Sequence, residues 1–233
     1  MRTAIILSGF VRTWEETASS FNSTFSHMNP DIFVTTYNKR YGYHPHIKNK
    51  INYYDDEYID VQKIEGMFTS ITPKFVEVED ADILDKIIDD ENKNMHPAMQ
   101  GFNNSFGQAR KLKLMVDYIQ EYEKENNIVY DTIIKTRCDM LYHDNIDFNI
   151  ASNEVLVDKG NVFPNDCVYM CNRDSFINAT NYVFDEFYQY RNPKSSVAAP
   201  HGVLEAAFLN SNLKIITRPI MRSVLRVGGE DFY

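Results

Sequence analysis

Two residues near the middle of the chain have the types and the spacing needed to bind a charged ligand. Arg137 and Asp139 stand two positions apart in the run 130–142, whose apolar beginning predicts a buried strand. Side chains two positions apart in a strand point to the same face, so the guanidinium and the carboxylate would share a ledge. A carboxylate can hold a metal ion while a guanidinium holds phosphate oxygens, which favours a metal-chelated diphosphate as ligand. The alternative is a local ion pair that binds nothing.

The N-terminal segment supplies a second group of candidates. The apolar run 3–7 predicts a central parallel strand, and a capping-box pattern after it predicts a helix over 13–28. Between them, Ser8 and Gly9 form a turn in which the glycine would let the main chain approach a ligand closely. A helix N-terminus favours anions, and Arg12 adds a full positive charge there. The segment therefore predicts a phosphate-binding corner, although a glycine at such a turn can also serve steric needs alone.

A second strand and a long helix add three more side chains. Residues 31–37 predict a strand that ends at Tyr37, whose ring could stack on a base or simply pack at the rim. The pattern over 105–127 predicts a helix on which Gln108 and Lys111 lie one turn apart and share a face. Ligands of open α/β sheets bind where the strands end, and a right-handed crossover would start this helix there. We therefore expect these side chains near the same edge.

The pattern as a whole predicts an α/β fold with a mixed, mostly parallel central sheet flanked by helices. We expect a single domain over 1–233, with 1–142 forming a nucleotide-binding half and 143–233 a mixed half. The acids Asp80 and Asp82 form an Asp-x-Asp pattern, but they head a helix, where capping alone explains acids. Further strands are expected at 73–79, 154–157, 166–171, 213–217 and 222–227, further helices at 55–68, 83–88, 175–190 and 201–210, and a loop at 38–54.

Composition narrows the classes of partner. The 233 residues carry a formal net charge of −9, which argues against a nucleic-acid binder because such a protein needs a basic face. An anionic ligand must then be held by a few local cations or by a metal. No stretch reaches the 18 or so apolar residues of a membrane span, and the opening apolar run is too short for a signal peptide. Three sparse cysteines do not form a disulfide framework, so we expect a cytoplasmic protein.

Taken in order along the chain, these features resemble a known family. A first strand that ends in Ser8, Gly9 and Arg12, a second that ends at Tyr37, a helix with Gln108 and Lys111, and then Arg137 and Asp139 are similar to the small GT-A-type glycosyltransferases. The nearest likeness is to those encoded by large DNA viruses and by bacterial surface-polysaccharide loci. The likeness spans most of the chain, but each motif in it is short.

The resemblance implies a function and a set of roles. The donor would be a nucleoside-diphosphate sugar, most often a UDP-sugar, and the acceptor a hydroxyl of a glycan or glycoprotein. A divalent ion, manganese before magnesium, would bridge the diphosphate to an Asp-x-Asp element, of which only Asp139 is present here. The residues implied in binding the nucleotide sugar are Ser8, Gly9, Arg12, Tyr37, Gln108, Lys111 and Arg137.

An inverting transferase also needs a carboxylate base on the side of the sugar opposite the phosphate. Two acids of the second half are candidates. Asp166 follows a turn-like segment at the start of a predicted strand, and Glu205 lies among apolar residues in a short helix. The alternatives are that Asp166 caps a turn and that Glu205 faces solvent. His201 and Arg226 are weaker candidates.

Two other functions remain open. A non-catalytic nucleotide-sugar or carbohydrate-binding module on the same fold would explain why the second acid is missing. A nucleotidyltransferase would need a glycine-rich basic first loop, whereas this loop has one glycine and one arginine.

Overall fold

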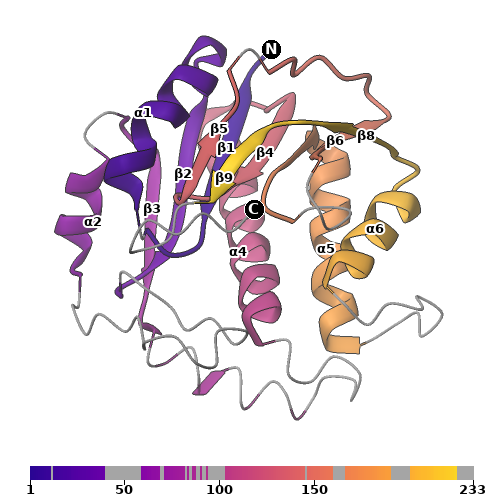
Figure 1. The fold of residues 1–233 in the computed structure, drawn as a ribbon. Helices are drawn as coiled ribbons and strands as arrows, with labels where there is room; N and C mark the ends of the chain where they lie inside the picture. Colours follow the sequence, from indigo (N-terminus) through magenta and orange to yellow (C-terminus); the bar gives the residue numbers. More distant parts are fainter. Residues whose placement is uncertain are drawn as a thin grey trace.

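A computed structural model describes most of the chain, and Figure 1 labels its elements. The described residues are 1–11, 13–39, 59–68, 71–81, 83, 86, 87, 90, 93, 103–144, 146–159, 166–189 and 200–224. The strands are β1 (Thr3–Ser8), β2 (Asp31–Tyr37), β3 (Phe75–Glu79), β4 (Thr132–Thr136), β5 (Met140–Tyr142), β6 (Glu154–Asp158), β7 (Tyr169–Asn172), β8 (Lys214–Arg218) and β9 (Met221–Val224). The helices are α1 (Trp14–Phe25), the short 3-10 helix η1 (Ser26–Met28), α2 (Val61–Met67), α4 (Asn103–Asn126), α5 (Arg173–Gln189) and α6 (Pro200–Asn210).

Seven strands form one sheet in the order β3-β2-β1-β4-β7-β6-β8. β1 is parallel to β2 and β4, β2 is parallel to β3, and β6 is parallel to β8. β7 runs antiparallel to both of its neighbours, β4 and β6. The predicted fold class, an α/β fold with a mixed, mostly parallel sheet, is therefore confirmed.

Helices cover both faces of this sheet (Figure 1). On one face α1, α2 and a two-stranded ribbon of β5 and β9 pack over Ile5 and Leu7 of β1. On the other face α4, α5 and α6 pack over Ala4 and Ile6 of the same strand. All six residues of β1 are buried, which is why its four central residues, 4–7, form an unbroken apolar run rather than an alternating one.

Most of the predicted elements are observed within about two residues of their expected limits, the usual uncertainty of element ends. One prediction about the first helix is wrong in detail. Thr13 stands at the N-cap of α1, but its side chain makes no capping hydrogen bond. The predicted capping box is therefore absent, although the helix begins where it was expected.

A second correction concerns the run 130–142, which is not one strand. β4 ends at Thr136, a turn occupies 137–139, and β5 begins at Met140 and pairs with β9 instead of the main sheet. Arg137 and Asp139 thus lie in the turn and do not share a strand face. They are close because their side chains form an ion pair.

Parts of the predicted segments, namely 40–58, 82, 84–85, 88, 190 and 225–227, fall outside the described residues. Among the residues that are described, no helix has the length and apolar character that crossing a membrane requires.

Candidate functional site

The carboxyl ends of the parallel strands meet at one edge of the sheet, and most of the predicted site residues lie at or near it. The register aligns Ser8 with Thr35 and Leu7 with Thr136, so β1, β2 and β4 end side by side. Because β7 is antiparallel, its entry, not its exit, lies at this edge, and Asp166 comes just before it. The edge is therefore the candidate site.

The turn after β1 has the conformation that its glycine suggested. Gly9 has φ of +120°, which residues with a side chain rarely adopt, and its N–H donates to the Thr35 carbonyl over 3.1 Å. Ser8 before it is buried. Arg12 lies outside the described residues, so its predicted contact with phosphate stays a prediction.

Tyr37 is at the predicted edge, but its ring is already packed. The residue is only 5% exposed, the Phe10 ring lies 4.6 Å from its ring centroid, and the Lys111 ammonium lies 4.3 Å from that centroid. Phe10, half-buried in the turn after Gly9, is thus the more exposed aromatic ring at this edge. The sequence reasoning missed Phe10, although its place directly after the glycine turn was a usable signal.

Lys111 does reach the strand edge, yet it serves the protein itself. Its Nζ is 2.9 Å from the Thr36 carbonyl and 3.1 Å from Thr35 Oγ1. It also lies 3.2 Å from carboxylate oxygens of both Glu77 and Glu79 on β3, and the residue is 1% exposed. The ammonium group therefore ties α4 to β2 and β3, and its predicted contact with phosphate stays a prediction. Gln108 is half-buried one helical turn before it.

Arg137 and Asp139 form a two-pronged ion pair. Nε donates to Oδ1 over 2.8 Å and Nη2 donates to Oδ2 over 2.7 Å. Burial opposes the charge of Arg137, but attraction to Asp139, supported by Cys167 and Asp166, outweighs it and holds the pKa of Arg137 well above its usual value. The guanidinium is therefore a permanent cation at the end of β4.

The turn that carries this pair is fixed from both sides. Thr17 of α1 donates its hydroxyl to the Cys138 carbonyl over 2.5 Å, and the Tyr142 hydroxyl donates to the Arg137 carbonyl over 3.3 Å. Tyr142 and Thr136 also share a hydrogen bond of 2.8 Å. The main chain of the turn is thus held in place, as a preorganised binding site requires.

Lys135 is a cation at this edge that the sequence reasoning did not select. It is 1% exposed, and its ammonium group donates to the main-chain carbonyls of Asp166 and Cys167, the latter over 3.4 Å. Burial lowers its pKa, while attraction to Asp166 opposes that change. A lysine inside a buried strand, two positions before Arg137, was the signal, because such a charge needs a buried partner.

The two candidate bases lie in different surroundings. Asp166 is half-buried beside Lys135 and Arg137, which both feel its charge. Glu205 is half-buried on α6, whose apolar residues Leu204 and Phe208 pack into the core. The turn after α6 leads directly into β8, so the helix begins toward the edge at which β8 ends. The structure brings Asp166, but not Glu205, into the charge cluster.

The donor set does not fit a divalent ion at Asp139. Both of its oxygens accept hydrogen bonds from Arg137, and the residue is 1% exposed. The described part of the chain contains no group of three or more His, Cys, Asp or Glu side chains arranged to hold a metal. The predicted manganese or magnesium site is thus without a suitable set of ligands among these residues.

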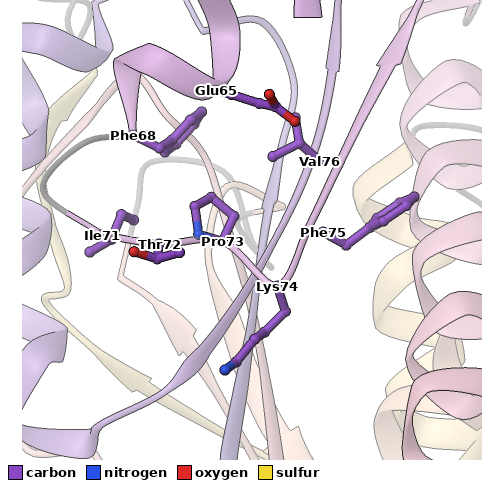
Figure 2. Close-up of a pocket in the computed structure, with 8 residues that line it drawn as sticks. All are labelled: Glu65, Phe68, Ile71, Thr72, Pro73, Lys74, Phe75 and Val76. Atoms are coloured by element: carbon purple, nitrogen blue, oxygen red, sulfur yellow. The ribbon is translucent and has the colours of Figure 1, made fainter. Parts of the chain in front are cut away.

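A separate pocket lies at the other end of the edge strand. A hollow of about 490 Å³ is lined by Glu65 of α2, by Phe68, Ile71 and Pro73 between α2 and β3, and by Val76 of β3 (Figure 2). Phe75 turns away from these side chains, and its ring stacks on Tyr118 of α4 with a centroid distance of 3.7 Å. None of the candidate residues lines this pocket, so it is distinct from the strand-end site.

A scan against models of known protein families finds no match for this chain, and a search of curated proteins finds none either.

Proposed function

We propose that the protein is a glycosyltransferase that moves a sugar from a nucleoside-diphosphate sugar, a UDP-sugar before others, to a hydroxyl of a glycan or glycoprotein. One observation carries the proposal. Lys135, Arg137, Asp139 and Asp166 gather at the carboxyl edge of a mostly parallel sheet, where α/β proteins bind nucleotides. The mixed, mostly parallel sheet agrees with the GT-A resemblance and supports the same conclusion.

The donor's diphosphate would lie against Arg137. A guanidinium offers paired N–H groups that match two phosphate oxygens, and it stabilises the charge that grows on the diphosphate as the sugar leaves. The turn after Gly9 would place the nucleoside, and the base would meet the half-buried Phe10 ring before the buried Tyr37. Lys111 holds β2 and β3 in register beneath them.

The chemistry is a displacement at the anomeric carbon. The acceptor oxygen forms a bond to that carbon, the bond from the carbon to the diphosphate oxygen breaks, and a carboxylate removes the hydroxyl proton. For inversion the base must lie across the sugar from the diphosphate. Asp166 stands next to Arg137 on the diphosphate side, so Glu205 fits the base better.

The second candidate function is a non-catalytic module that binds nucleotide sugars or carbohydrates. The observation that favours it is the closed ion pair, in which Asp139 already has its charge matched. Such a module would bind the donor and release it unchanged.

A two-stage experiment separates these functions. First, the melting temperature is measured with a panel of nucleoside diphosphates and their sugars, because a ligand that binds only the folded state raises it. Second, sugar release is measured for wild type, Glu205→Gln and Asp166→Asn with the donor that binds best. We expect Glu205→Gln to lower turnover by roughly 100-fold or more, in the range of general-base catalysis, with little change in donor binding. Binding without any turnover would favour the module, and no binding across the panel would refute both functions.

A further inference from the structure

We propose that the diphosphate site at the end of β4 works without a divalent ion, with Arg137 supplying the positive charge and Asp139 acting as the positioning residue that aims it. This inference rests on the proposed function and concerns the chemistry of the same site. It departs from the metal-bridged arrangement that the resemblance implies.

The geometry of the ion pair disfavours a metal ion on Asp139. One guanidinium donates to both oxygens of Asp139, over 2.8 and 2.7 Å. A metal ion bound by this carboxylate would need at least one of those oxygens, so the two-pronged pair would have to open. Opening it would leave Arg137, whose positive charge is permanent, directly beside a divalent cation.

The two partners differ in how far they are exposed to a ligand. The side chain of Arg137 is 18% exposed, whereas that of Asp139 is 1% exposed. A ligand at this edge therefore meets the guanidinium first and the carboxylate lies beneath it. A metal-bridging carboxylate needs the opposite order, because the ion must stand between the carboxylate and the phosphates.

Arg137 keeps further N–H donors beyond those that bind Asp139. A guanidinium has five N–H donors, and the pair with Asp139 uses two of them. In the part of the chain that the structure describes, the remaining three donate to no protein group. Asp139 fixes the plane of the guanidinium, and the turn that carries both residues is fixed by Thr17 and Tyr142. Preorganised donors of this kind are what a diphosphate needs.

Lys135 is a second basic side chain at the end of β4, two positions before Arg137. Its ammonium group is buried and held by the carbonyls of Asp166 and Cys167, so its position is fixed before any ligand binds. Arg137, whose pKa is held well above its usual value, would repel a divalent ion placed between it and the diphosphate. The positive charge that a metal would bring is thus already part of the chain.

The test is the affinity of UDP for the wild-type protein, measured by isothermal titration calorimetry with EDTA, with manganese and with magnesium. We expect dissociation constants that agree within about twofold in all three conditions, since that difference is far below one factor of ten. Binding that is at least tenfold tighter with manganese than with EDTA would overturn the inference while leaving the proposed function standing. If UDP and UDP-sugars bind in none of these conditions, both the inference and the proposed function fail.

Variants test the assigned roles. Arg137→Lys keeps the charge but loses the paired N–H groups, so UDP should bind about tenfold more weakly with EDTA and with manganese alike. Asp139→Asn should weaken UDP binding by a smaller factor without creating or removing a response to manganese. A manganese response that is present in wild type and lost in Asp139→Asn would show that Asp139 is a metal ligand and would refute the proposal. Lys113→Met, which removes a cation from the α4 pair with Asp117, is the matched control and should bind UDP as wild type does.

Because Asp139 is buried, its variant could lose stability, and circular dichroism must show native secondary structure before its affinity is interpreted. The comparison of wild type with EDTA and with manganese needs no variant, and it decides the inference alone.

Discussion

Replacing Lys111 with methionine decides whether this lysine supports the fold or binds the ligand. The ammonium group is 1% exposed and contacts two carboxylates, those of Glu77 and Glu79, each at 3.2 Å. Breaking a buried ion pair by removing one partner costs about 3–5 kcal/mol. Glu77 and Glu79 are 25% and 13% exposed, so solvent screens part of the interaction. The lower end of that range, about 3 kcal/mol, is the expected loss of unfolding free energy.

Urea unfolding followed by circular dichroism measures that loss, and the melting temperature should fall by roughly 6–12 °C for a chain of this size. Lys113→Met is the control, because Lys113 pairs with Asp117 in a partly exposed i,i+4 contact on the same helix. The control should cost about 0.5 kcal/mol or less. The Lys111→Met change made in a Glu77→Gln background should cost less than in wild type, because one of the two carboxylates is then already neutral.

The result that would refute this reasoning is a small loss of stability with a large loss of binding. If Lys111→Met costs less than about 1 kcal/mol and weakens UDP binding by about tenfold, the ammonium group contacts the ligand in solution and not β3. A supporting role would be confirmed if the variant loses about 3 kcal/mol of unfolding free energy and still binds UDP almost as tightly as wild type does. The affinity must be measured at a temperature where the variant is folded.

Three further predictions follow from single features of the structure. Gly9→Ala should lower the unfolding free energy by about 1–2 kcal/mol, because the φ of Gly9 is +120°. Gly66→Ala in α2 should raise the unfolding free energy by about 0.5–1 kcal/mol, because an added Cβ meets nothing within 4 Å there, as at Gly9, and alanine favours a helix. Urea unfolding measures both changes. Burial raises the pKa of Cys167 from 9.0 to about 11, so the native thiol should react slowly with Ellman's reagent at pH 8, and fast reaction without denaturant would contradict this. The free energy of unfolding should fall as the pH rises from about 9 to 11, because the thiol of the unfolded chain loses its proton first. Glu123 is 4% exposed, and its contacts of 2.6–3.0 Å with Arg173 join α4 to α5. Arg173→Met removes the cation of this buried carboxylate and should lower the unfolding free energy, measured with urea, by about 2–4 kcal/mol. A loss near zero would show that the pair is not needed.

The sequence predicts the strands of this fold well because they are buried on both faces. β1 has an unbroken apolar run from Ala4 to Leu7, and β4 contains the apolar pair Ile133 and Ile134. The long helix α4 shows a clear stripe of Leu112, Met115, Val116 and Ile119, all of which are in the core. Where the chain turns sharply, the prediction is weaker. The run 130–142 contains no glycine or proline to mark the turn at 137–139, so it reads as one strand.

The roles of single cations were harder to predict than the elements that carry them. Lys111 was placed at the correct edge, but its partners Glu77 and Glu79 lie on β3, which pairs with β2 in a register that no local pattern reveals. Lys135 was missed because its acceptors are main-chain carbonyls at the entry of β7, and main-chain groups leave no mark on the sequence. Sequence patterns therefore predict which residues reach an edge, whereas long-range pairing decides whether a charge is used there by the protein or by a ligand.

The reversed direction of β7 explains how a residue from the second half of the chain joins the site. In a fully parallel sheet, the segment before a strand lies at the opposite edge from the strand ends, so Asp166 would be one strand length, roughly 13 Å for four residues, away from Arg137. Because β7 is antiparallel to β4, Lys135 pairs with Tyr169 and the preceding Asp166 lies beside the end of β4. The carbonyls of Asp166 and Cys167 then become the acceptors that a buried Lys135 requires. The antiparallel strand and the buried lysine thus depend on each other, and a change at Lys135 should disturb the entry of β7 before it disturbs the parallel half of the sheet.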